Sequence, residues 1–208
     1  MNIIKYICFF ILISTCCDVL AIKKGRFLLI SGPSGVGKST VISYLKQLDS
    51  NFIYVTPYTT RKLRPGEQDK VSISIEQMHD LDRASKLLTI NKIYGIYYGT
   101  PRDIIDTALI NGKNPILDWP IEKIEIMQKQ YKDKLFVVYL HPEDINELKA
   151  RLSIDKRDVD GKRIDLGVQE LKNFYNGEYD NSIDLKIVNK NELAKQIASL
   201  IYKKFMQL

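Results

Sequence analysis

The 208-residue sequence contains little cysteine, and its three cysteines all lie near the start, at Cys8, Cys16 and Cys17. The rest of the chain therefore has no side chains for a disulfide, a cysteine zinc site or a thiol nucleophile. The two histidines, His79 and His141, are far apart and lack metal-ligand spacing. Only 11 glycines and 7 prolines are present, which excludes collagen-like and low-complexity proteins.

The composition that remains is typical of a folded domain. Apolar residues make up 45% of the chain and aromatic residues 10%, which excludes an intrinsically disordered chain. Lysine and arginine number 31 against 25 aspartates and glutamates, a net charge of +6. Such a mild excess suits anionic small-molecule ligands, and no nucleic-acid-binding motif accompanies it. We therefore expect no nucleic-acid partner.

Residues 1–21 differ from the rest of the chain. Lys5 precedes an uncharged apolar run, Tyr6–Cys17, of about 12 residues, which is short of the roughly 20 that span a bilayer as a helix. Three interpretations stay open: a cleaved signal or leader, a retained membrane-proximal anchor, or a start codon chosen too far upstream. Contact with a membrane is expected only if this segment is retained.

The order of apolar runs after residue 21 predicts the fold class. Short apolar runs predict buried strands at 26–31, 116–118, 135–140 and around 187–188. Helical spacing predicts helices at 39–48, 102–111, 121–131, 143–152, 164–175 and 191–206. This alternation predicts one α/β domain over 22–208, with three layers and a parallel central sheet. Residues 55–100 break the rhythm and predict a small inserted subdomain.

A phosphate-binding loop follows the first predicted strand. Residues 32–39, GPSGVGKS, match the pattern G-x-x-x-x-G-K-[ST] between a strand and a helix, which is its functional context. Lys38 is expected to bridge phosphates and Ser39 to ligate Mg²⁺, so the motif predicts ATP and Mg²⁺ as ligands. The expected ATP contacts are Gly32, Ser34, Gly35, Gly37, Lys38, Ser39 and Thr40.

Further motifs follow in a characteristic order. They are TTRKLRPGE at 59–67, YYGT at 97–100, ILD at 116–118, RL at 151–152 and IVN at 187–189. Together with the loop, they resemble the guanylate kinase family over residues 25–206. The resemblance implies a P-loop NTPase fold that transfers a phosphoryl group from ATP to GMP. It also implies an acceptor-binding insert at about 55–100, a lid at about 151–163, and a monomer or homodimer acting on a small nucleotide. An ATP requirement favours the cytoplasm.

The resemblance also implies roles for single residues on the acceptor side. Arg61 and Arg64, three residues apart, are expected to grip the acceptor phosphate with the Tyr98 hydroxyl, as forked guanidinium groups can. The alternative is a solvated pair of surface arginines. Thr100 and Asp118 are expected in the acceptor site. Asp118 could also assist Mg²⁺ through water or cap a helix.

On the donor side, Arg163 resembles a lid arginine that closes over the ATP phosphates. It belongs to the predicted catalytic set with Lys38, Arg61 and Arg64. An exposed basic loop is the alternative. The lid departs from the family pattern because Asp155 replaces an arginine, for which Lys156 or Arg157 could substitute. Asn189 matches a position near adenine, with a loop-capping role as the alternative. Trp119, the single tryptophan, either stacks on a ligand or fills core.

Departures from the family cluster on base recognition. Pro57, Thr89 and Pro120 stand where the family has a serine, a guanine-reading glutamate and an aspartate, and Lys70 falls near a lost tyrosine. Loss of such groups is expected to weaken discrimination between bases. Three outcomes stay open: a divergent guanylate kinase, a kinase for another phosphorylated acceptor such as ribose 1,5-bisphosphate, and a non-catalytic nucleotide-binding or scaffold relative.

Overall fold

The computed structural model describes residues 24–93, 95–154, 161–190 and 193–207. The predicted leader at 1–21 and the lid residues Asp155, Lys156 and Arg157 lie outside these ranges. Among the described residues, no helix combines the length and apolar character needed to cross a membrane.

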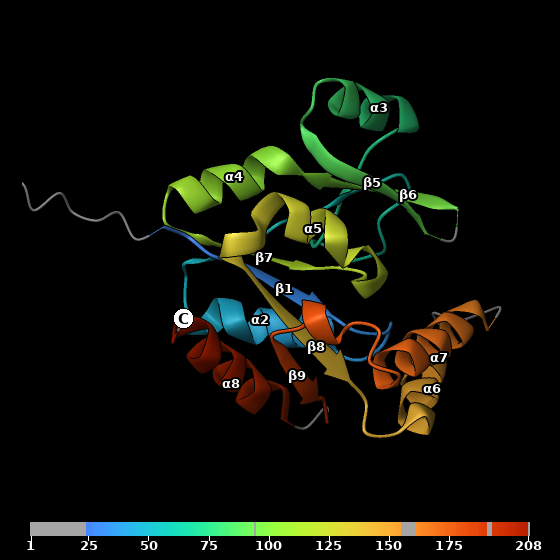
Figure 1. Cartoon of the computed structure of the whole chain (residues 1–208). Coiled ribbons are helices and arrows are strands. Elements are labelled where there is room, and N and C mark those ends of the chain that lie inside the picture. Colours follow the sequence, from blue (N-terminus) through green and yellow to red (C-terminus); the bar gives the residue numbers. More distant parts are fainter. Residues whose placement is uncertain (1–23, 94, 155–160, 191–192, 208) are drawn as a thin grey trace, which may run out of the picture.

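Five parallel strands form the central sheet, which confirms the predicted α/β fold class (Figure 1). Their order is β2-β7-β1-β8-β9, and every neighbouring pair is parallel. The strands are β1 (Phe27–Ser31), β2 (Phe52–Tyr54), β7 (Asn114–Asp118), β8 (Leu135–His141) and β9 (Leu185–Val188). The three-residue β2 was not predicted, because only Phe52 of its residues is buried and so short a strand leaves no periodic pattern.

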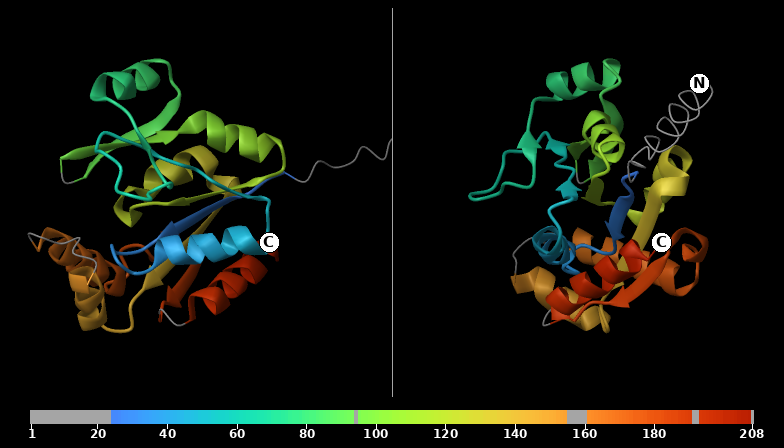
Figure 2. Two further views of the ribbon diagram at one scale, coloured as in Figure 1. Left: turned by 180° about the vertical axis from the view of Figure 1, so that it is seen from behind. Right: turned by 90° about the vertical axis from the view of Figure 1, so that its left-hand side faces the viewer.

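Helices cover both faces of this sheet because its strands are apolar on both faces. All five residues of β1 are buried, and its four apolar side chains alternate between two cores. Leu28 and Ile30 pack in the core that includes α2 (Lys38–Leu48) and α8 (Ala194–Met206). Phe27 and Leu29 pack in the core that includes α4 (Arg102–Ile110) and α5 (Ile124–Tyr131). Figure 2 shows α2 and α8 on one side of the sheet and α4 on the other.

The helices agree with the predicted ones to within a few residues. They are α2 (Lys38–Leu48), α4 (Arg102–Ile110), α5 (Ile124–Tyr131), α6 (Ile145–Ile154), α7 (Lys162–Tyr175) and α8 (Ala194–Met206). The helix predicted at 121–131 is divided into a 3-10 turn, η1 (Ile121–Lys123), and α5. Two further 3-10 turns are η2 (Lys132–Lys134) and η3 (Asp180–Ser182).

A second sheet occupies the region in which the sequence predicts an insert. Its strands are β3 (Tyr58–Thr59), β4 (Val71–Ser72), β5 (Leu87–Ile93) and β6 (Ile96–Pro101), in the order β4-β3-β6-β5. Helix α3 (Ile75–Arg83) packs against β5, and Ser74 and Gln77 form a capping box at its start. Figure 1 shows this sheet and α3 beside the central sheet, near the end of β7.

Candidate functional site

The phosphate-binding loop joins β1 to α2 at the carboxyl end of the central sheet. Gly32, Gly35 and Gly37 have φ angles of 131°, 83° and 96°, a region that residues with a Cβ rarely adopt. A Cβ at Gly32 would also overlap the carbonyl oxygen of Leu140 on β8. These glycines therefore allow the loop to curl at the start of α2, where backbone N–H groups are available to an anion.

Lys38 folds back over this loop. Its Nζ donates to the carbonyl oxygens of Gly32 at 2.6 Å and Pro33 at 3.0 Å. Arg163, in the first turn of α7, donates from Nη1 to Ser34 Oγ at 3.4 Å. Two predicted cations thus lie at one loop although they are more than a hundred residues apart in sequence. Ser39 and Thr40 are exposed in the first turn of α2.

Asn189 lies beneath the same loop and is completely buried. Its Nδ2 donates to the carbonyl oxygen of Val36, and its backbone N–H donates to the carbonyl oxygen of His141 at 2.8 Å. Its Oδ1 has no hydrogen-bond partner among the described residues. Asn189 therefore supports the loop, a role close to the loop-capping alternative. Its contact with adenine stays a prediction.

A partly buried acid also lies near the loop and was not identified from the sequence. Glu170 of α7 accepts a hydrogen bond from the Tyr139 hydroxyl at 2.9 Å. Burial raises the pKa of Glu170 to about 7, while the positive charge of Lys38 acts in the opposite direction. Glu170 was missed because its signal, an acid on an otherwise amphipathic helix, does not differ from that of a surface glutamate.

The predicted phosphate-gripping arginines lie in the loop after β3. The Arg61 guanidinium makes a bidentate contact with the Glu67 carboxylate, and Nη1 to Oε2 measures 2.7 Å. The Arg64 backbone N–H donates to the same carboxylate at 2.9 Å, whereas its side chain is exposed. Glu67 therefore organises the loop and holds Arg61 in one orientation, so Arg61 is not a freely solvated surface residue.

Tyr98 and Thr100 lie on β6 of the second sheet. Tyr98 stands opposite Thr59 on β3, and its hydroxyl contributes, after Glu67, to raising the pKa of Arg61. Thr100 is buried and stands opposite Thr89 on β5, where the family has its glutamate. The structure thus brings Arg61 and Tyr98 together, as the sequence predicts.

Asp118 ends β7 and accepts a hydrogen bond from the Tyr54 hydroxyl at 3.1 Å. The next residue, Trp119, is 3% exposed and packs in the core on the α4 and α5 side. Trp119 therefore fills core, the second of its two expected roles. Its Nε1 donates to the backbone carbonyl of Lys123 at 3.0 Å, which fixes the turn that follows β7.

The donor side offers few ligands for a divalent cation. The described residues contain no group of three or more histidine, cysteine or acidic side chains that could hold a metal. Mg²⁺ characteristically keeps several waters and is shared between phosphates and one or two protein oxygens. The exposed Ser39 hydroxyl at the start of α2, with Asp118 at the end of a neighbouring strand, fits such a site.

Comparisons with known proteins point to one family. The family model described as guanylate kinase matches residues 24–204. A guanylate kinase from Lactococcus lactis is 31% identical over 180 residues, covering 84% of this chain and 85% of the relative. One from Lactiplantibacillus plantarum is 35% identical over 164 residues, covering 76% and 79%. The crystal structure of guanylate kinase from Anaplasma phagocytophilum shares the fold, with a TM-score of 0.71 at 20% identity, over 89% of this chain and 86% of that one.

Proposed function

The chain belongs to the guanylate kinase family, and on this basis we propose that it transfers the γ-phosphoryl group of ATP to GMP. An oxygen of the GMP phosphate forms the new bond to the γ-phosphorus, and the bond from that phosphorus to the β,γ-bridging oxygen breaks. The products are ADP and GDP. The observation that carries this proposal is a glycine loop with Lys38 folded over it in a chain that matches the family almost throughout.

The donor roles follow from the contacts around the loop. Lys38 leaves the loop carbonyls and binds the β- and γ-phosphates of ATP, and Arg163 adds positive charge beside Ser34. Phosphoryl transfer depends on such positioning and charge neutralisation rather than on covalent chemistry by the protein. The Oδ1 of Asn189, which has no hydrogen-bond partner in the described part of the chain, is an acceptor suited to the amino group of adenine. Ser39 would hold Mg²⁺, which would neutralise phosphate charge.

The acceptor roles fall to the second sheet and the end of β7. Arg61, Arg64 and Tyr98 bind the GMP phosphate, with Arg61 already oriented by Glu67. Thr100 and Asp118 line the acceptor site from β6 and β7. Closure of the lid at about 151–163 would exclude water during transfer. Because ATP is the donor, the proposed site of action is the cytoplasm.

Acceptor-dependent ADP release tests this function. The purified protein is given ATP and Mg²⁺ with GMP, dGMP, AMP, UMP or ribose 1,5-bisphosphate. We expect turnover with GMP and a loss of about 100-fold or more in Lys38→Met, as when a transition-state charge contact is removed. Lys46→Met is the matched control, because Lys46 is exposed on the same helix.

Each alternative predicts a different result in this assay. Turnover with ribose 1,5-bisphosphate alone would identify another acceptor, which the named relatives do not favour. ATP binding without ADP release for any acceptor would indicate a non-catalytic relative. Full activity of Lys38→Met would refute the assigned role of the loop.

A further inference from the structure

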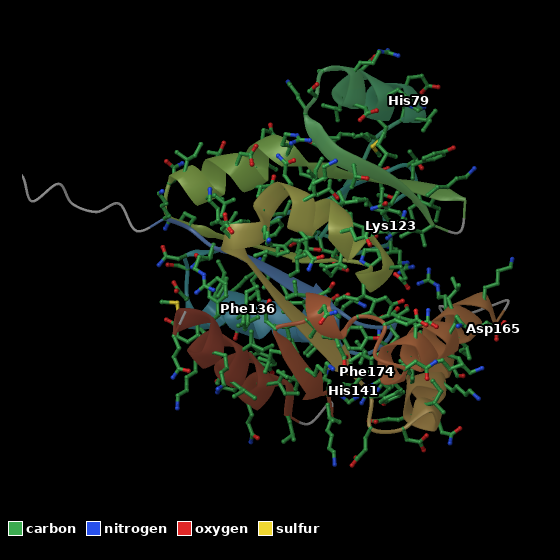
Figure 3. All side chains as sticks on the ribbon, in the orientation of Figure 1. His79, Lys123, Phe136, His141, Asp165 and Phe174 are labelled. Atoms are coloured by element: carbon green, nitrogen blue, oxygen red, sulfur yellow. The ribbon has the colours of Figure 1, made fainter. Side chains whose placement is uncertain are left out.

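A partly buried hydrogen bond connects the second sheet to the turn after β7, where the family's base-reading carboxylates are missing. Lys123 Nζ, from η1 directly after β7, donates to Asn91 Oδ1 on β5 at 2.7 Å. Asn91 is 5% exposed. In Figure 3 the Lys123 side chain lies between the second sheet and the turn that follows β7. Neither residue was identified from the sequence.

Asn91 faces the same way as the phosphate-gripping residues. It stands directly opposite Tyr98 in the antiparallel register of β5 and β6, and directly opposed residues share one face of a sheet. The Tyr98 hydroxyl in turn is a hydrogen-bond partner of Arg61 and raises its pKa. Thr89, two residues before Asn91 on the same strand, belongs to this face as well. This face therefore carries the Tyr98 hydroxyl of the phosphate grip, the Asn91 amide and the Thr89 hydroxyl. Thr89 provides no carboxylate in place of the family's glutamate.

The Lys123–Asn91 pair presents a donor beside an acceptor. A lysine ammonium group only donates hydrogen bonds, and an amide oxygen has two lone pairs, of which Lys123 uses one. A 6-oxopurine offers the complementary arrangement on adjacent atoms, because O6 accepts and N1–H donates. A 6-aminopurine offers the opposite arrangement, in which the amino group donates and N1 accepts.

We propose that Asn91 and Lys123 recognise the acceptor base, with Lys123 donating to O6 and Asn91 Oδ1 accepting from N1–H. The inference rests on the proposed function and names its substrate class: 6-oxopurine nucleoside monophosphates. Because Thr89 supplies no carboxylate for the 2-amino group of guanine, GMP and IMP are both acceptors. AMP is rejected because it leaves buried polar groups facing like partners.

Steady-state kinetics with GMP, IMP and AMP test the pair. In the wild type we expect kcat/KM for GMP and IMP to agree within about tenfold, and that for AMP to be about 100-fold lower. Lys123→Met should lower kcat/KM for GMP and IMP by roughly 10- to 100-fold and leave AMP unchanged. Asn91→Leu, a second variant, should have the same effect.

The matched control is Lys92→Met. Lys92 is the exposed neighbour of Asn91 on β5, and its ammonium lies 5.2 Å from the centre of the Tyr97 ring. This variant should keep the wild-type ratios of kcat/KM among GMP, IMP and AMP. If Lys123→Met and Asn91→Leu lower kcat/KM for all three acceptors by one common factor, the pair only holds the second sheet against the turn after β7. The inference is then wrong. A wild type that prefers GMP over IMP by 1,000-fold would overturn it too.

Equilibrium binding separates this inference from the proposed function. Calorimetric titrations of GMP, IMP and AMP into the wild type and both variants need no turnover. If no acceptor yields ADP, but GMP and IMP bind the wild type more tightly than AMP and lose this advantage in the variants, the proposed function fails and the recognition pair stands. If the wild type is active and neither variant changes the base preference in kinetics or in binding, the proposed function stands and the recognition pair is wrong.

Discussion

Replacement of Glu67 by glutamine tests how the acceptor-phosphate grip is built. The Glu67 carboxylate accepts hydrogen bonds from the Arg61 guanidinium and the Arg64 backbone N–H, and Lys70 Nζ lies 3.9 Å from it. The side chains of Arg61 and Glu67 are 16% and 11% exposed, so the ion pair is largely shielded from water. These contacts, with the Arg61 hydrogen bond the largest, lower the pKa of Glu67 from 4.5 to about 2.

The lowered pKa sets the size and the pH range of the effect. Because a tenfold change in proton affinity corresponds to about 1.4 kcal/mol, the ionised Glu67 stabilises the fold by at most about 3.5 kcal/mol, and by less where water screens the ion pair. The unfolded chain binds a proton here near pH 4.5 and the native chain only near pH 2. The contribution is therefore fully present above about pH 5 and is lost as the pH falls toward 2. Glu67→Gln should lower the free energy of unfolding at pH 7 by about 1 to 3 kcal/mol.

The kinetic effect should fall on the acceptor alone. Without its carboxylate partner, Arg61 must be ordered by the substrate, at a cost of about 0.5 to 1.5 kcal/mol. We therefore expect KM for GMP to rise about 3- to 10-fold and KM for ATP to stay constant. Urea unfolding at pH 7 and pH 3, with initial-rate kinetics, measures both effects, and Asp82→Asn on exposed α3 is the control. A stability and a KM for GMP equal to those of the wild type would refute the reasoning.

Two further predictions concern residues around the phosphate loop. Asn189→Ala leaves the buried Val36 carbonyl without its donor, so urea unfolding should show a loss of about 1 to 3 kcal/mol, together with a higher KM for ATP. A variant as stable as the wild type would contradict this supporting role. Glu170 has a pKa of about 7, raised by burial, so the native state keeps a proton that the unfolded state releases above pH 4.5. As the pH rises from 4.5 to 7, the wild type should therefore lose stability relative to Glu170→Gln; parallel unfolding profiles of the two proteins would disprove the titration of Glu170 in this range.

The fold could be predicted where strands are buried on both faces. Runs such as LFVVYL in β8 are apolar throughout, and this pattern is typical of a parallel sheet covered by helices. The second sheet gives a weaker signal because β3 and β4 have two residues each and β4 is exposed. Helix α3 had a readable signal, because Ser74 and Gln77 have the spacing of a capping box.

The parts of the site that could be predicted are those in which a motif of fixed residue types and spacing is tied to a single chemistry. The glycine loop and Lys38 meet that condition, and the structure gives these glycines the positive φ angles that phosphate loops need. Contacts between distant residues could not be predicted. Arg163 meets Ser34, and Asn189 meets Val36, only because α7 and the end of β9 pack beside the loop. A single sequence does not reveal such contacts.

Base recognition illustrates why a missing motif residue does not imply a missing function. The family's glutamate position, Thr89, is one of several positions on a strand face, and alternation along β5 places Asn91 on that face as well. Its partner Lys123 lies three residues after Pro120, another of the altered positions, and the Trp119 side chain donates to the Lys123 backbone carbonyl and fixes this turn. Thr89 provides no carboxylate to accept hydrogen bonds from the guanine N–H groups. The lysine–asparagine pair instead provides a donor for O6 and an acceptor for N1–H. Such a pair retains the distinction between oxo and amino purines and gives up the distinction between guanine and hypoxanthine. The IMP to AMP ratio is therefore more informative about this chain than activity with GMP alone.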